Sequence, residues 1–230
     1  WLNLTDEALA KEGFTTPEAA QAERTRRFRL WVAAHTVPND FESPKDGKDV
    51  LRFNLATSLM EGGTFEQIIQ QGYDGYWLLK LSGVADPKPS SNGLSVNLQT
   101  EQEDMAFRKI RVTQSGLVHL RSQSGCIFDY RLIAPAAMLG LEWGQNQPAE
   151  AATTTFNANV NEERAYTDNN FRTSAFLGRA ASTTDWQVLI FSGAPEAGLS
   201  DMDLQQLTDI ELNFSITRAS RAPATPGPTD

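Results

Sequence analysis

The sequence predicts a mainly β protein: an antiparallel β-sandwich of the jelly-roll or Greek-key kind, preceded by a short helical N-terminal arm. The first observation is that short apolar-patterned segments, separated by turn residues, recur from residue 50 to residue 218. The second is that helical patterns concentrate in the first 38 residues. The third is the closing segment Asp209–Arg218, whose expected apolar face carries Ile210, Leu212, Phe214 and Ile216. Such a strand requires sheet neighbours and an apolar layer over that face.

Composition narrows the functional classes. The chain has 230 residues, of which 40% are hydrophobic, enough for one large or two small domains with a real core. Acidic residues outnumber basic ones by 29 to 20, which gives a formal net charge of −9 and disfavours nucleic acid as a partner. No apolar run reaches the roughly 18 residues of a transmembrane helix, so the sequence predicts no membrane span.

Residues 1–44 are expected to form the helical arm and a following loop. Thr5 is a candidate cap for a helix that runs to Glu12, and Gly13 is its stop. The segment Thr15-Thr16-Pro17-Glu18 predicts a second helix start, with a Thr-x-x-Glu capping box. This helix is expected to end near His35 and to bury only its last two turns, or to contact a partner.

Residues 45–220 are expected to form the β-sandwich domain, and residues 221–230 a flexible Pro- and Thr-rich tail. Strands are predicted at residues 50–59, 73–84, 94–98, 107–112, 116–121, 126–132, 153–160, 186–191 and 209–218. The short turns at 113–116 and 122–125 predict that the strands between 107 and 132 form a three-stranded meander. A helical turn is expected between Ser200 and Thr208.

The cysteine and the histidines of the chain indicate no reactive site. Cys126 is the only cysteine, so no internal disulfide exists, which fits a cytoplasmic protein and equally a secreted bacterial one. We expect Cys126 to be a small buried hydrophobe and His119 to lie on a sheet surface. Because the chain begins with Trp1, we interpret it as a processed chain or a piece of a longer one.

Three stretches carry a family resemblance. The first is Phe156-x-x-Asn159-Val160-x-x-Glu163-Arg164-Ala165-Tyr166, followed by Ser182-x-x-x-Trp186-Gln187-Val188 and then by the closing segment from Leu207 to Arg218. The second is residues 51–83, two strands of which the later ends in a glycine, and the third is residues 110–129, with a Gly-x-x-x-x-Arg turn. In this order they resemble the β-rich C-terminal region of the A subunits of bacterial Tc toxins, the insecticidal toxin complexes. The chain departs from that family at Ile216, where a tyrosine is usual.

The resemblance implies a non-catalytic interaction or assembly module of a large, toxin-like complex. Its partners would be other subunits of the assembly or further copies of this chain. The implied location is secreted or extracellular in a bacterium, and a cytoplasmic location stays open. No catalytic residue is implied, because this region of the family has no catalytic motif.

The residues themselves also indicate no enzyme and no cofactor, since neither a Gly-x-Ser-x-Gly elbow nor a phosphate-binding glycine loop occurs. The alternative function is a carbohydrate-binding module that recognises cell-surface glycans through exposed aromatic rings. Its candidate ligand-binding residues are Tyr73, Asp74, Tyr76, Trp77 and Trp143. The competing interpretation of these rings is packing in the core.

One metal candidate exists. Asp201 and Asp203, followed by Asp209 and Glu211, offer hard oxygen ligands for Ca²⁺. The competing interpretation is that Ser200 or Asp201 caps a helical turn and that Asp209 begins a strand. The loop lacks the spacing and the glycine of an EF-hand, which favours capping.

Overall fold

The computed structural model describes residues 5–40, 42–55, 76–81, 94–102, 107–121, 126–131, 152–159, 179–180, 182–183, 185–193, 201–214 and 216–220. The helical elements are α1 (Asp6–Lys11), α2 (Pro17–His35), η1 (Pro44–Asp46) and η4 (Leu204–Gln206). The strands are β1 (Thr36–Pro38), β2 (Asp49–Leu55), β3 (Tyr76–Leu81), β4 (Leu94–Thr100), β5 (Phe107–Gln114), β6 (Leu117–Arg121), β7 (Ile127–Arg131), β8 (Ala152–Asn159), β9 (Ser182–Thr183), β10 (Trp186–Phe191), β11 (Leu207–Phe214) and β12 (Ile216–Ser220). The described chain is therefore mainly β with an N-terminal helical segment, as the sequence predicts.

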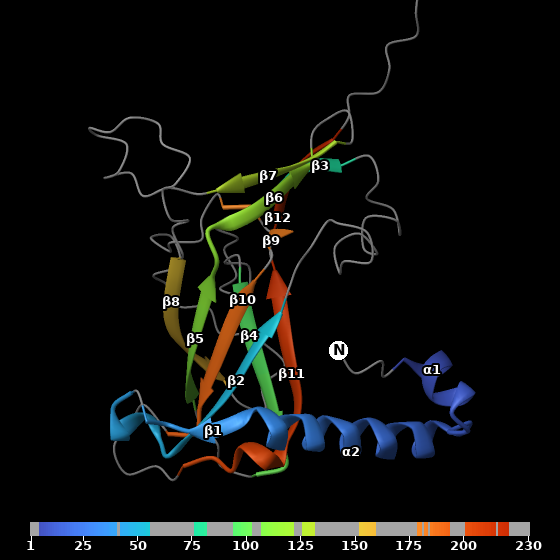
Figure 1. Ribbon diagram of the computed structural model, residues 1–230. Helices are drawn as coiled ribbons and strands as arrows, with labels where there is room; N and C mark the ends of the chain where they lie inside the picture. Colours follow the sequence, from blue (N-terminus) through green and yellow to red (C-terminus); the bar gives the residue numbers. More distant parts are fainter. Residues whose placement is uncertain are drawn as a thin grey trace, which may run out of the picture.

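The strands pair antiparallel in four groups (Figure 1). The largest is a five-stranded sheet with the order β1-β2-β10-β5-β8. Strands β4 and β11 form a separate pair, as do β3 and β12, and β7-β6-β9 form a three-stranded sheet. In Figure 1 the last two groups lie beyond one end of the five-stranded sheet, and α2 runs across its other end.

One apolar core joins the five-stranded sheet, the β4–β11 pair and α2. Alternation along β2, β5 and β10 sends every second side chain to the same face of the sheet. That face contributes Leu51, Phe53, Leu55, Ile110, Val112, Trp186, Val188 and Ile190. The β4–β11 pair contributes Val96, Leu98 and Leu207, and the segment before β11 contributes Met202 and Leu204. Val32 of α2 completes the buried cluster.

The two helices begin and end where the sequence predicts, with one correction. The Thr5 side chain accepts a hydrogen bond from the Ala8 backbone N–H, and Gly13 has a φ of +101° just after α1. The cap of α2 is Thr16, whose side chain accepts a hydrogen bond from the Ala19 backbone N–H at 3.2 Å. The expected capping box, which needs Thr15 as the cap, is therefore wrong, because the helix begins one residue later.

The last two turns of α2 pack on the core, as expected, but the helix does not bury these turns alone, because Ala20 and Glu23 of its first half are also buried. Phe28 and Trp31 lie against the cluster that contains Val32, and the Trp31 ring meets the Phe53 ring edge-on with centroids 5.1 Å apart. The first half of α2 packs on α1, where Leu9 is fully buried. The helical segment is therefore held on the β core at one end and covered by α1 at the other.

A network of ion pairs ties α1 to α2. The Glu23 carboxylate accepts hydrogen bonds from both Arg26 and Arg27, at 2.6–2.7 Å. Arg27 also pairs with Glu12, just after α1. The hydrogen bonds from Arg26, and then those from Arg27, lower the pKa of Glu23 from 4.5 to about 2.

This network predicts a specific acid sensitivity. Because the pKa of Glu23 is lower in the folded state, its contribution to stability is present above about pH 4.5 and is lost as the pH falls towards about 2. Replacing Glu23 with glutamine is expected to reduce stability at pH 7 and to flatten the decline between pH 5 and pH 2. Urea denaturation across that range measures the effect, with Glu18→Gln on the same helix as the control. Identical pH profiles for Glu23→Gln and the wild type would contradict the network.

Two expectations about strand connections are wrong. The closing segment is two strands: β11 pairs with β4, and β12 pairs with β3 in a different sheet. The meander is formed only in part: β6 pairs with β7 as expected, but β5 pairs with β8 and β10 and not with β6, whose other neighbour is β9. The expected turn at 113–116 begins later, since β5 continues through Gln114, whose side-chain amide donates to the Ala180 carbonyl at 2.7 Å. The Ser115 N–H then bonds the Asp185 carbonyl at 2.9 Å as the chain passes between sheets.

The face assignment of β11 is confirmed where its side chains are described. Ile210 and Leu212 are partly buried against the core, and Glu211 between them is exposed. The short strands β1 and β9 lie in segments where no strand was expected. No described helix is both long enough and apolar enough to cross a membrane.

Two single-residue expectations are corrected. Cys126 is exposed, because it precedes the start of β7 at Ile127. His119 is only 7% exposed, because it lies in the central strand of its sheet, between Asp129 of β7 and Ser182 of β9. Cys126 is therefore exposed where a buried residue was expected, and His119 is buried where a surface residue was expected.

Candidate functional site

The aromatic candidates fall mostly outside the part of the chain that the structure describes. Tyr73, Asp74 and Trp143 lie outside the described residues. Tyr76 and Trp77 begin β3, where their backbones pair with Ser220 and Ala219 of β12. The aromatic platform therefore remains a prediction from the sequence.

The metal candidate behaves as a capping site. The Asp203 side chain accepts a hydrogen bond from the Gln205 backbone N–H at 3.0 Å and so caps η4. Asp201 is exposed, and its carboxylate accepts a hydrogen bond of 3.4 Å from the Lys48 backbone N–H. Among the described residues, no group of three or more His, Cys, Asp or Glu side chains is arranged to hold a metal ion. A capped helical turn is therefore present as the competing interpretation expected, but its cap is Asp203, whereas Ser200 or Asp201 was expected.

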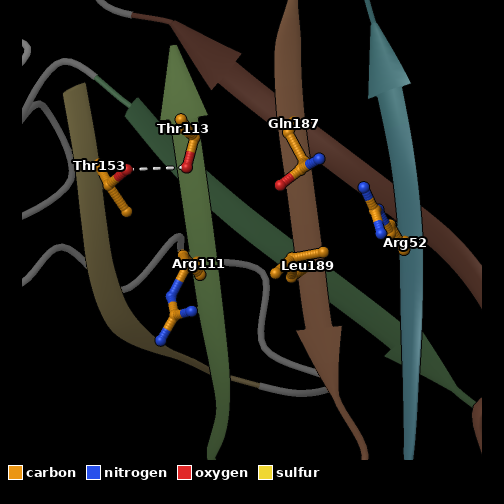
Figure 2. Close-up of a pocket in the computed structure, with 6 residues that line it drawn as sticks. All are labelled: Arg52, Arg111, Thr113, Thr153, Gln187 and Leu189. Atoms are coloured by element: carbon orange, nitrogen blue, oxygen red, sulfur yellow. Dashed lines mark hydrogen bonds between the residues drawn. The ribbon is translucent and has the colours of Figure 1, made fainter. Parts of the chain in front are cut away.

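A polar hollow lies on the outer face of the five-stranded sheet, away from the core (Figure 2). Its volume is about 330 Å³, and its lining comes from four neighbouring strands: Arg52, Arg111, Thr113, Thr153, Gln187 and Leu189. The register of the four strands explains why these six side chains lie together. Leu189 of β10 lies between Arg52 of β2 and Arg111 of β5, and Gln187 pairs with Thr113, which in turn pairs with Thr153.

The side chains of the hollow are of two kinds. The Thr113 and Thr153 hydroxyls share a hydrogen bond of 2.9 Å (Figure 2). Hydroxyl and amide groups both donate and accept hydrogen bonds, whereas a guanidinium only donates. None of these groups changes charge near pH 7. The arrangement can therefore bind a polar or anionic group, and its lining offers neither a nucleophile with a neighbouring base nor a general acid.

The loop after β1 closes one end of this face. Glu42 pairs with Arg111, and Asp46 accepts a hydrogen bond from Lys109 Nζ at 2.7 Å. The hydrogen bond from Arg111 is the main cause that lowers the pKa of Glu42. Both cations also lie over the Phe191 ring, at 5.0 Å for Lys109 and 5.8 Å for Arg111. The two cations thus cover Phe191, which forms a small buried cluster with Val50 and Leu189 on the outer face of the sheet.

A second hollow, with a volume of about 580 Å³, lies on the exposed surface of α2. Its lining consists of Gln21, Ala22, Thr25, Arg26, Arg29, Leu30, Ala33 and Gln205. Leu30 is 58% exposed, the largest value among the described large apolar side chains that are exposed. Arg26 precedes it by one turn and Ala33 follows it by one turn, so this surface combines an apolar centre with a polar border.

Sequence reasoning missed both hollows. The sheet hollow draws on four strands that are far apart in the chain, and only the order β2-β10-β5-β8 brings them together. In the sequence, the sheet hollow is indicated only by Arg52, a charged residue at an outward position between Leu51 and Phe53. For α2, the signal was the apolar residue Leu30 beside an arginine-rich helix face.

Comparison with known proteins adds no relative: no family matches this sequence, and no curated protein or solved structure is significantly similar to it.

Proposed function

We propose that this chain is a non-catalytic interaction and assembly module of a large, toxin-like secreted complex. The observation that carries the proposal is the solvent face of α2, where the exposed Leu30 lies in an open hollow with a polar border. Protein interfaces have this composition, with an apolar centre and a polar, arginine-containing rim. The toxin-like, secreted setting rests on the resemblance of the closing segment and of the two segments before it.

Helix α2 is suited to this role because it is held firmly. Its last turns pack on the core through Trp31 and Val32, and its first half is tied to α1 by ion pairs. A surface on a rigid element loses little conformational entropy when it binds a partner. Its partners would be other subunits of the complex or a second copy of this chain.

The two-layer arrangement of the β core belongs to the same proposal. We propose that the five-stranded sheet and the β4–β11 pair are the two layers of a β-sandwich. The shared core cluster supports this, because Val188 and Ile190 of one sheet and Val96 and Leu98 of the other bury their side chains in it. A sandwich leaves the outer face of the larger sheet available for recognition.

Self-association through α2 is the form of the proposal that the purified chain itself tests. Light scattering across a range of protein concentrations is expected to show a mass above the 25.4 kDa of one chain. Replacing Leu30 with arginine is expected to shift the mass to that of one chain, because a charge in the centre of an interface is costly to bury.

The matched control is Leu117→Arg, since Leu117 is also an exposed leucine, at 42%, but lies on β6. It should leave the association unchanged. A mass of 25.4 kDa at every concentration would rule out self-association, and equal effects of both variants would rule out α2 as the interface.

Carbohydrate binding is the second candidate function. The sheet hollow favours it, because Gln187, Thr113 and Thr153 place groups that both donate and accept hydrogen bonds around one open space. Sugar hydroxyls require such mixed partners. This hollow, and not the aromatic segment around Trp77, is the described surface that supports the second candidate.

A further inference from the structure

The sheet hollow is organised as two rows of side chains (Figure 2). One row runs across three strands as Arg52, Leu189 and Arg111, and the other continues across the sheet as Gln187, Thr113 and Thr153. Neighbouring strands lie about 4.8 Å apart, so the backbones of the two arginines are roughly 10 Å from each other. A ligand between them would lie over Leu189, with the polar row along one side.

The two arginines of the hollow differ in charge balance. Arg111 is paired with Glu42, so its charge is compensated and its side chain is held in place. Arg52 is exposed, and no described carboxylate lies within ion-pair distance of it. The described part of the hollow therefore has one uncompensated positive charge. A ligand group with a single negative charge complements it, whereas a nucleic acid or other polyanion would also be repelled by the net charge of −9.

The polar row specifies the rest of the ligand. The Gln187 amide makes no side-chain hydrogen bond within the described chain, and the two threonine hydroxyls bond each other at 2.9 Å. A sugar hydroxyl can donate to one of these groups and accept from another. The volume of about 330 Å³ is at the lower end of small-molecule sites, which suits one sugar ring. A protein carboxylate would use the arginine but would leave the acceptors of this row unused.

We propose that the sheet hollow binds the carboxylate-bearing ring of an acidic sugar of the uronic acid class. The Arg52 guanidinium pairs with the sugar carboxylate, because the planar fork matches a carboxylate in two parallel hydrogen bonds. Gln187 and Thr113 bond the ring hydroxyls, and Leu189 lies beneath the ring. The inference rests on the second candidate function and does not depend on assembly through α2.

A matched pair of sugars tests the charge assignment. Methyl β-glucuronide and methyl β-glucoside differ only in the carboxylate, and their affinities for the full chain can be compared by NMR titration. The glucuronide is expected to bind at least about tenfold more tightly, and added salt should weaken its binding selectively. Arg52→Gln should remove the preference, and Arg52→Lys should restore part of it.

Arg24→Gln is the control variant, because Arg24 is an arginine of α2 and does not line the sheet hollow. It should leave the preference unchanged. Circular dichroism of each variant checks the fold, which an exposed position such as Arg52 should not disturb.

The remaining outcomes separate the two levels of the proposal. Equal binding of both sugars, insensitive to Arg52→Gln, would overturn the acidic ligand but leave carbohydrate binding intact. Binding of neither sugar to the folded chain would overturn both, without affecting assembly through α2. If poly-L-glutamate bound through Arg52 and the glucuronide did not, the hollow would receive a protein carboxylate, and the sugar assignment would be wrong.

Discussion

Replacing Trp186 with alanine is expected to lower the free energy of unfolding by about 3–5 kcal/mol. Trp186 is 1% exposed and is the largest fully buried side chain described. It lies at the start of β10, the central strand of the five-stranded sheet, opposite Leu55 of β2 and Gln114 of β5. Truncation would remove contacts on both sides and leave a cavity that the flanking strands cannot close, because their register is fixed by backbone hydrogen bonds.

Urea denaturation followed by circular dichroism measures this loss. Gln187→Ala is the matched control, because the next residue of the same strand points to the outer face and should change stability by no more than about 0.5 kcal/mol. If Trp186→Ala does not fold, Ile190→Val on the same strand and face should still fold, with a loss of about 0.5–1.5 kcal/mol. A loss below about 1 kcal/mol for Trp186→Ala would contradict the placement of this side chain in the shared core.

The elements that sequence reasoning placed well carry their signal locally. The start of α2 depends on Thr16 and Pro17, which are adjacent in the chain. The burial of β10 follows from the continuous apolar run from Val188 to Phe191, which is typical of a strand covered on both faces. The faces of β11 follow from strict alternation, which assigns Ile210 inward and Glu211 outward without knowledge of the neighbouring strand.

Pairing partners are not local, and the errors lie there. The alternation that runs through Phe214 and Ile216 gives the face of each residue but not the strand beside it. One pattern therefore covers two strands, β11 and β12, that pair with β4 and β3. In the same way, the turn near Ser115 predicts a hairpin from its composition, although β5 and β6 belong to different sheets. The sheet hollow depends on three strand pairings at once, so no single segment indicates it.

Replacing Gly47 with alanine is expected to destabilise the chain by about 2–4 kcal/mol, for two separable reasons. Gly47 has a φ of +96°, which a side chain disfavours by about 1–2 kcal/mol. A Cβ there would also lie 2.1 Å from the backbone nitrogen of Gly193, and backbone atoms cannot rotate away as a side chain does. The substitution would push the Glu42–Asp46 loop off the sheet, break the 2.8 Å hydrogen bond from the Gly193 N–H to the Asp46 carbonyl and expose Phe191.

Two other glycines separate these reasons. Gly13 has a similar φ of +101° but nothing within 4 Å of the added Cβ, so Gly13→Ala should show only the backbone cost of about 1–2 kcal/mol. Gly193→Ala should lose stability mainly through the steric clash, since its Cβ would lie 2.2 Å from backbone atoms of Asp46 and Gly47. Because Gly47 and Gly193 form one contact, the double variant should lose less than the sum of the single losses in urea denaturation. If Gly47→Ala is no more destabilising than Gly13→Ala, the loop does not approach the sheet this closely, and the ion pair that holds Arg111 at the edge of the hollow would lose its support.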